Sequence, residues 1–268
     1  MLEPTSWWLG YVVIGAFVGI FAGMLGIGGG LLIIPLLALA LEAQGVTREH
    51  VLHLAVGTAM ATIVFTSLSS ARAHASRGAV RWDIALRMTP GILLGGVAGA
   101  TLAKFFSTRI FALYITVFVF AVAINMALDL RPKPARQPPG TVGMFAAGFV
   151  IGGLSSLVAI GGAAMSVPFM LYCNVSMIHA IGTAAAIGFP IAVGGTIGYI
   201  ASGWTAVGLP QGSVGFVYLP ALVGITVASV LTAPLGARIA HRLPAKKLRL
   251  IFALFLFALA TRMLVSLW

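Results

Sequence analysis

Residues 23–30 read GMLGIGGG, and residues 155–162 read SSLVAIGG. Each glycine run interrupts a long apolar segment, at residues 7–41 in the first case and at residues 142–173 in the second. Glycine weakens a helix because its backbone loses more conformational freedom on folding than that of any other residue. Two such interruptions at matching places therefore predict that both segments are broken helices.

The composition is that of an integral membrane protein. Hydrophobic residues make up 60% of the chain and charged residues 8%, and the mean hydropathy is +1.09. The 101 residues between Arg136 and Arg238 include no Asp, Glu, Lys or Arg, which leaves room for several transmembrane helices. We therefore predict an all-α, multi-pass helical bundle in the cell (inner) membrane.

The chain divides into two similar halves. Apolar runs between charged breaks predict segments at residues 7–41, 48–72, 84–105, 109–129, 142–173, 177–201, 214–240 and 246–267. A basic, proline-rich linker at residues 131–141 separates residues 1–130 from residues 142–268. Three motifs recur in the same order: IGGGLLIIP with IGGAAMSVP, AVGTA with AIGTA, and GATLAKFFSTRIFAL with GARIAHRLPAKKLRL. Internal repeats of this kind are typical of secondary transporters.

Segments 7–41 and 142–173 are too long for simple membrane crossings. A straight helix of 32 residues would reach about 48 Å, against a hydrocarbon core of about 30 Å. Each segment is therefore either a broken, tilted crossing or a re-entrant hairpin. If all eight segments cross the membrane, 7 of the 16 Lys and Arg residues lie on one side and 9 on the other, which is no bias. With two hairpins, 12 face the cytoplasm and 4 face outside, as the positive-inside rule requires.

The charge distribution thus favours two inverted repeats. Each repeat is predicted to be a glycine-broken re-entrant hairpin followed by three transmembrane helices, with both termini extracytoplasmic. The second arm of each hairpin would begin at the glycine run, and a helix start presents free N–H groups and the positive end of the helix dipole to an anion. The predicted substrate-binding residues at the two tips are Gly28, Gly29, Gly30, Gly161, Gly162 and Ala163.

Other glycines are spaced by four residues rather than placed consecutively. This spacing lets neighbouring helices approach closely. We therefore predict that two glycine series serve helix packing: Gly15, Gly19 and Gly23, and Gly91, Gly95 and Gly99.

These motifs resemble those of a known family. The stretch GMLGIGGGLLIIPLL, its repeat AIGGAAMSVP, the two GTA triplets and the GARIAHRLP segment are similar to the TauE/SafE family of sulfite and organosulfonate exporters. The resemblance covers nearly the whole chain. It implies transport, usually outward, of sulfite, an organosulfonate such as sulfoacetate, or a small carboxylated relative. The second run departs from the first at one place, since Ala163 stands where the first run has Gly30.

Polar side chains near the glycines are further candidates for the site. Thr58 and Thr183 occupy equivalent places in AVGTA and AIGTA, and both substrate binding and a bond to their own helix are open to them. Ser156 and Ser166 flank the second glycine run, and Ser155, Thr62 and Ser67 are weaker candidates. His53 and His179 stand near the starts of paired helices. They either sense protons or charge there, or lie at the headgroup interface.

The remaining features limit the function class. All acidic residues lie at or beyond segment ends, which disfavours cation transport and proton coupling through a buried carboxylate. One cysteine and no metal-binding or serine–histidine pattern predict no enzyme activity, no metal and no cofactor. Arg262 is expected to snorkel to the outer interface.

The expected mechanism is alternating access. The expected partners are a small anion and the lipid bilayer, not nucleic acid, and a homodimer is left open. An anion channel or a small-carboxylate permease of the same architecture is the alternative function.

Overall fold

The structure is a computed structural model that describes residues 7–25, 29–128, 133–240 and 245–266. Within these ranges it contains ten helices: α1 (Trp8–Leu25), α2 (Gly30–Ala43), α3 (Arg48–Ala75), α4 (Trp82–Ala103), α5 (Thr108–Leu128), α6 (Thr141–Leu157), α7 (Ala163–Tyr172), α8 (Met177–Gly203), α9 (Leu219–Ala240) and α10 (Ala245–Ser266). The predicted all-α class is confirmed. The start of predicted segment 214–240 instead belongs to a short antiparallel hairpin of β1 (Ser213–Val214) and β2 (Val217–Tyr218).

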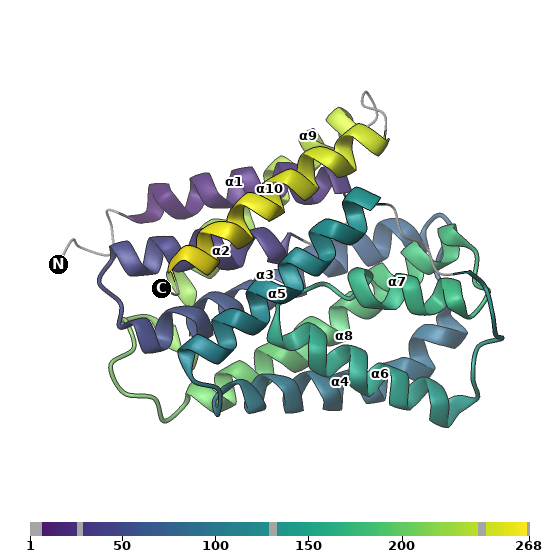
Figure 1. Ribbon diagram of the computed structural model, residues 1–268, viewed down its shortest axis with the longest axis horizontal. Coiled ribbons are helices and arrows are strands. Elements are labelled where there is room, and N and C mark those ends of the chain that lie inside the picture. Colours follow the sequence, from purple (N-terminus) through teal and green to yellow (C-terminus); the bar gives the residue numbers. More distant parts are fainter. Residues whose placement is uncertain (1–6, 26–28, 129–132, 241–244, 267–268) are drawn as a thin grey trace.

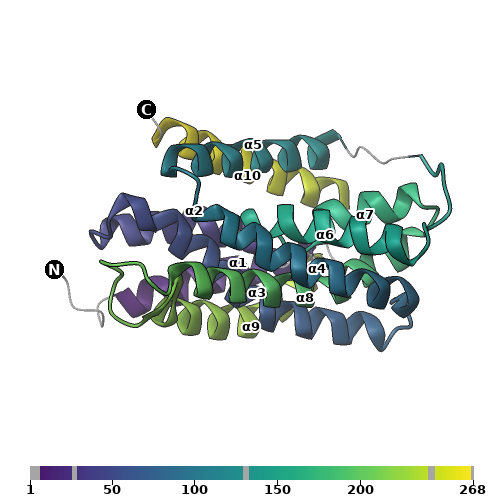
Figure 2. The same ribbon diagram turned by 90° about the horizontal axis from the view of Figure 1, so that it is seen from below.

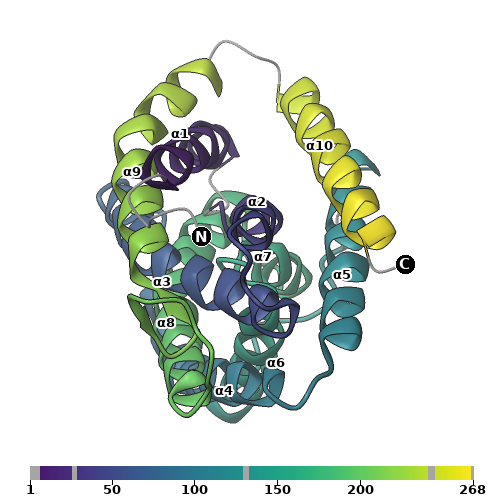
Figure 3. The same ribbon diagram turned by 90° about the vertical axis from the view of Figure 1, so that its left-hand side faces the viewer.

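Among the described residues, five helices are long and apolar enough to cross a membrane. They are α3, α4, α5, α8 and the part of α9 from Leu219 to Gly236. The helices run roughly along the long axis of the molecule (Figure 1). Viewed from one end, α1 and α9 lie on one side, α5 and α10 on the other, and α2, α3 and α7 lie between them (Figure 3).

Both predicted broken segments are indeed interrupted helices. Segment 7–41 contains α1 and α2, and segment 142–173 contains α6 and α7. The short helix α2 occupies the left-hand half of the molecule and α7 the right-hand half, as two views show (Figures 1 and 2). The first turn of α1 and the last turn of α10 lie at the same, left-hand end of the bundle (Figure 1).

Glycines bring helix backbones into direct contact. Helix α1 packs along α9, and α4 packs along α6. A Cβ atom at Gly91 or Gly95 of α4 would overlap a carbonyl oxygen of α6, and one at Gly15 or Gly19 of α1 would overlap the backbone of α9. A Cβ at Gly99 of α4 would likewise overlap the carbonyl oxygen of Gly153 in α6, so the predicted packing role is confirmed for these five glycines.

The α4–α6 interface should respond sharply to a single added methyl group at Gly95. We expect Gly95→Ala to lower the free energy of unfolding by about 1–3 kcal/mol, because the new Cβ would force α4 and α6 apart. On α6, the matched variant Gly153→Ala places its Cβ 3.4 Å from the carbonyl oxygen of Gly95 and should cost little. Thermal unfolding of the two purified variants tests this difference, and equal midpoints would contradict the close backbone contact.

Candidate functional site

The two short helices begin at glycines with left-handed backbones. Gly29 immediately precedes α2 with φ 73°, and Gly162 immediately precedes α7 with φ 75°. A side chain at this φ is strained, so glycine is the residue that suits both positions. The glycine therefore allows the chain to change direction between the two helices of each segment, as the sequence predicted for a break. Gly28 lies outside the described residues.

The start of α2 contacts the turn that precedes α7 inside the bundle. Gly29, Gly30 and Gly162 are buried, and a Cβ at Gly30 would overlap the carbonyl oxygen of Ala159 in the turn between α6 and α7. The carbonyl oxygen of Gly161 lies against Gly188 of α8, where an added Cβ would approach it to 3.0 Å. The structure thus places Gly30 of the first run against Ala159, in the turn that contains Gly161 and Gly162, and a role of these glycines in substrate binding stays a prediction.

The meeting point exposes polar backbone rather than side chains. The first amides of a helix have no acceptor within that helix, and neither Gly29 nor Gly162 can supply a side-chain cap. The amides of Leu32 and Ile33 donate to the carbonyl oxygen of Gly29, and the amide of Ala163 donates to that of Gly161. The two starts therefore contribute the positive ends of two helix dipoles to this region. Such an arrangement attracts negative charge.

Thr58 and Thr183 are placed equivalently, and both hydroxyls are already engaged. The Thr58 Oγ1 accepts a 2.9 Å hydrogen bond from the amide of Tyr218, just before α9. The Thr183 Oγ1 accepts one of 2.9 Å from the amide of Arg81, just before α4. Both threonines are fully buried. Each hydroxyl therefore satisfies the start of a helix in the other half of the chain, and a role in substrate binding stays a prediction.

The predicted serines lie close to the second glycine run and are buried. Ser166 donates to the carbonyl oxygen of Gly162 at 2.7 Å, and Ser156 donates to that of Gly153 at 2.8 Å. Bonds of this kind satisfy the hydroxyl proton within its own helix and leave the oxygen lone pairs as acceptors. In this arrangement neither hydroxyl donates to an anion, so binding through Ser156 or Ser166 would require the hydroxyl to rotate.

The two predicted histidines lie near the starts of α3 and α8, away from the two glycine runs. They differ from each other in burial and in hydrogen-bond partners. His53 is buried, with Nε2 3.0 Å from the carbonyl oxygen of Ala103 and Nδ1 3.2 Å from that of Glu49. His179 is partly exposed, and its Nδ1 lies 2.8 Å from the hydroxyl of Ser176. His53 is in the first turns of α3 and His179 in the first turn of α8. The structure therefore does not bring the two histidines together, and their sensing role stays a prediction.

Sequence reasoning missed two residues of the meeting point. Ala159 has a left-handed backbone, with φ 44°, although it is not a glycine. Gly188 lies within α8 and contacts the Gly161 carbonyl region. No sequence motif marks either residue. Both were found only from the tertiary contacts of the two glycine turns.

The comparison with known proteins agrees with this architecture. The family described as Sulfite exporter TauE/SafE matches residues 11–263. This chain belongs to the TauE/SafE family. It is accordingly a multi-pass membrane protein of a family of membrane transporters rather than of enzymes.

Several curated relatives of this TauE/SafE chain are full-length matches. A probable membrane transporter protein of Haemophilus influenzae is 34% identical over 259 residues, covering 95% of this chain and 97% of the relative. The probable membrane transporter protein YdhB of Bacillus subtilis is 30% identical over 234 residues, covering 84% and 87%. A probable membrane transporter protein of Methanocaldococcus jannaschii is 24% identical over 261 residues, covering 95% and 94%. No solved structure matches the chain.

The structural role of Thr58 can be tested by removing its hydroxyl. Thr58→Val keeps the side-chain shape but leaves the Tyr218 amide without an acceptor, so we expect the free energy of unfolding to fall by about 1–3 kcal/mol. Thr58→Ser keeps the hydroxyl oxygen, so its free energy of unfolding should fall by clearly less than that of Thr58→Val. Both are measured by thermal unfolding of purified protein.

Thr116 provides the matched control for Thr58. Among the described residues its hydroxyl is buried without a hydrogen-bond partner, so Thr116→Val should be neutral or stabilising. Equal losses in Thr58→Val and Thr116→Val would show that the Tyr218 amide does not depend on Thr58.

Proposed function

We propose that this protein is a secondary carrier that exports a small oxyanion, such as sulfite, sulfoacetate or a related organosulfonate. The anion binds between the N-termini of α2 and α7, which meet near the membrane midplane. Alternating access then opens this site to each side in turn. The observation that carries the proposal is the contact between Gly30 and the Ala159 carbonyl oxygen, because it joins the two glycine-rich turns inside the bundle.

The lengths of α2 and α7 support re-entrant hairpins. Helix α2 has 14 residues and α7 has 10, so they extend about 21 and 15 Å at 1.5 Å per residue. The hydrocarbon core is about 30 Å thick, which neither helix can cross. Each pair, α1 with α2 and α6 with α7, therefore enters the membrane and returns to the same side.

The packing of the helices supports an inverted repeat. Exchanging α1–α5 for α6–α10 maps the contact of α1 with α9 onto the contact of α6 with α4, and both contacts are extensive. It also maps the hydrogen bond of Thr58 to the start of α9 onto that of Thr183 to the start of α4. Two repeats related in this way bring their equivalent tips together from opposite faces.

The distribution of basic residues supports the orientation. The end of the bundle where α3 ends and α4 begins includes the described basic residues Arg72, Arg77, Arg81, Arg87, Lys133, Arg136 and Arg238. The opposite end includes Arg48, Lys104, Arg109 and Arg262. By the positive-inside rule the richer end is cytoplasmic. The termini are then extracytoplasmic.

The electrostatics favour an anion over a cation. Two helix N-termini contribute about half a positive charge each, and the described acidic residues, Glu42, Glu49 and Asp83, lie at helix ends rather than at the meeting point. Because the cytoplasm is electrically negative, each exported negative charge gains about 2.3 kcal/mol per 100 mV. Export therefore needs no coupling ion in principle.

A ligand screen followed by counterflow tests the proposal. Sulfite, sulfoacetate and ethanesulfonate should raise the unfolding temperature of the purified protein, whereas the neutral dimethyl sulfone should not. In proteoliposomes, unlabelled sulfonate on the trans side should stimulate uptake of labelled sulfonate. Gly162→Ala should reduce this counterflow at least about tenfold, because it strains the backbone at the tip and displaces the α7 amides from the anion.

Gly45→Ala is the matched control for the tip variant. Gly45 also has a positive φ, of 79°, but an added Cβ there has no heavy atom within 4 Å. It lies just beyond α2 and away from the tips, so its variant should suffer similar backbone strain and keep counterflow. Equal loss in both variants, or stabilisation by cations and neutral solutes alone, would refute the anion site. Large single-channel currents without trans stimulation would indicate a channel instead.

The carrier should respond to membrane potential as an uncoupled anion exporter. In proteoliposomes held at 100 mV, inside negative, the monoanion ethanesulfonate should distribute to an outside-to-inside ratio of about 50, since 2.3 kcal/mol corresponds to that factor at 25 °C. The ratio is measured with labelled sulfonate at several pH values on both sides. A distribution set by the pH gradient rather than by the potential would contradict uncoupled export.

A further inference from the structure

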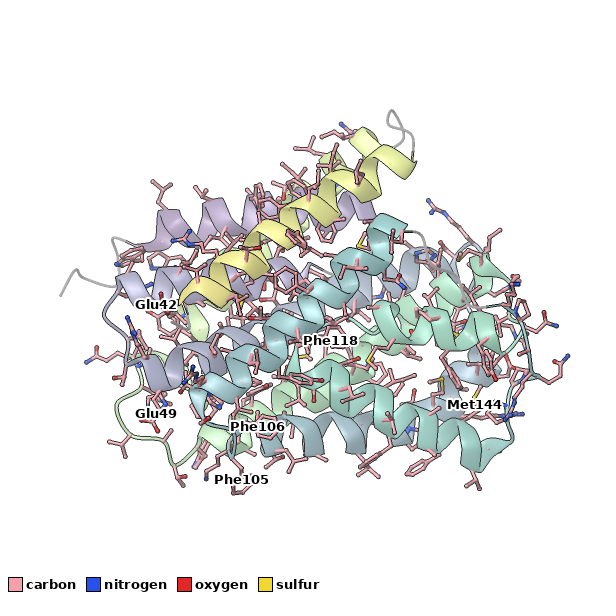
Figure 4. The ribbon with its side chains drawn as sticks, in the orientation of Figure 1. Glu42, Glu49, Phe105, Phe106, Phe118 and Met144 are labelled. Carbon is pink, nitrogen blue, oxygen red and sulfur yellow. The ribbon has the colours of Figure 1, made fainter. Side chains whose placement is uncertain are left out.

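A cleft of about 330 Å³ opens at the end of the bundle opposite the predicted cytoplasmic end. It is lined by residues of α2, α3, α5 and α10. Three guanidinium groups, of Arg48, Arg109 and Arg262, face a single carboxylate, of Glu42. Figure 4 shows Glu42 at this end, beside the last turns of α10. Among the described residues, the charged side chains that line the cleft are three positive and one negative, a net charge of +2.

The cleft is polar at its mouth and apolar at its base. The four charged side chains are exposed, whereas the deeper lining includes Pro35, Ala38 and Val51. From Glu42 the cleft follows α2 inward to Pro35, a distance of about 10 Å along the helix. Pro35 lies about one and a half turns from Gly30, where α2 begins. The cleft thus points along α2 toward the meeting point of the two tips.

We propose that this cleft binds a small organic anion and forms the outer vestibule of the transport path. A sulfonate or carboxylate group would lie among the guanidinium groups, whose planar geometry matches two oxygens at once. A short aliphatic portion would lie on the apolar base. The volume lies within the range usual for small-molecule sites. The outward direction of the path rests on the proposed function, whereas the charge and shape of the cleft do not.

Two of the arginines of the vestibule, Arg48 and Arg262, have no arginine counterparts at the opposite end of the bundle. In the alignment of AVGTA with AIGTA, Arg48 corresponds to Cys173, and Arg262 corresponds to Asn125 across the repeat. The exchange of halves therefore does not reproduce this pair of arginines at the opposite end. Arg262 was expected to snorkel to the outer interface. Its place in the lining of the cleft gives it the proposed role of binding the anion.

An anionic phospholipid headgroup shares the chemistry of the proposed ligand, since it also joins a negative group to an apolar chain. The test must therefore separate a dissolved anion from a lipid. It uses a single reporter cysteine, introduced as Leu39→Cys at a partly exposed position of the cleft lining. The buried native Cys173 is first replaced by serine.

The reporter is modified with two reagents of opposite charge. In Cys173→Ser with Leu39→Cys, the ratio of the rate of 2-sulfonatoethyl methanethiosulfonate to that of its trimethylammonium analogue should exceed the same ratio measured for 2-mercaptoethanol in solution. Replacing Arg48 and Arg262 with glutamine should lower the anionic-to-cationic rate ratio at least about tenfold, because each removed charge slows one reagent and speeds the other. Arg87→Gln, at an exposed position of α4 at the other end, is the control and should leave the ratio unchanged. An unaltered ratio in the double variant overturns the proposal.

Protection experiments identify the occupant. Millimolar ethanesulfonate should slow the modification of the reporter cysteine several-fold in detergent, and the neutral ethyl methyl sulfone should not. The reporter cysteine is also modified in nanodiscs of phosphatidylglycerol and of phosphatidylcholine. If phosphatidylglycerol slows the modification while ethanesulfonate does not, the cleft is a lipid site and the proposal fails. In right-side-out vesicles the impermeant reagents should reach the reporter from outside, and labelling only from the cytoplasmic side overturns the outer placement.

These measurements separate the vestibule from the carrier function. Protection is measured on purified protein without transport, and Gly162→Ala should retain it even where counterflow is lost. Loss of sulfonate protection with intact counterflow overturns the vestibule alone. Intact protection without counterflow in the unaltered protein supports the vestibule and overturns the carrier.

Discussion

Backbone amides at the depth of a bilayer must find acceptors within the protein, and the centre of this structure depends on how that requirement is met. Helix interiors satisfy it by themselves, so the difficult groups are the first amides of each helix. For α9 and α4, a buried threonine hydroxyl from the other half of the chain accepts a bond from the amide of the residue just before the helix, Tyr218 or Arg81. For α2 and α7, the preceding glycines offer no side chain. Their first turns instead bond backbone carbonyl oxygens of the glycine turns, such as that of Gly29 for Leu32 and that of Gly162 for Ser166, and the proposed anion site uses the positive ends of these two helix dipoles.

Two kinds of helix contact divide the bundle. The contacts of α1 with α9 and of α4 with α6 bring backbones together through glycine, which fixes the separation of the helices. Helices α5 and α10 contain no glycine, and large rings join them to each other and to α1, as in the pairs Phe120–Phe257 and Phe17–Phe255. Long side chains can change rotamer while staying in contact, whereas a glycine contact is lost on any separation. The helices thus fall into a glycine-packed set, with close backbone contacts, and the α5–α10 pair, whose contacts are made by side chains.

The sequence predicted the features that depend on local chemistry. Consecutive glycines marked the breaks at Gly29 and Gly162, and spaced glycines marked the packed faces of α1 and α4. The threonines of AVGTA and AIGTA were recognised as equivalent, but their bonds to the starts of α9 and α4 were not, because those partners lie 160 and 102 residues away in the chain. The position of Ala159 against Gly30 and the gathering of three arginines in one cleft depend on tertiary packing in the same way. Periodicity and motifs carry no information about such long-range contacts.

The differences between the halves bear on direction. Two inverted repeats with identical surfaces would present the same field to both sides of the membrane, and the protein would then give no preference to either entrance. Here the equivalent tips and threonines are shared, while the two ends differ: the predicted cytoplasmic end is far richer in Lys and Arg, and the opposite end gathers a few arginines in a narrow cleft. A broad basic surface raises the local concentration of anions, whereas a narrow cleft holds one anion at a time. In the proposed carrier, the shared tips would form one central site, and the unequal charges would distinguish an entrance that collects anions from an exit that receives them singly.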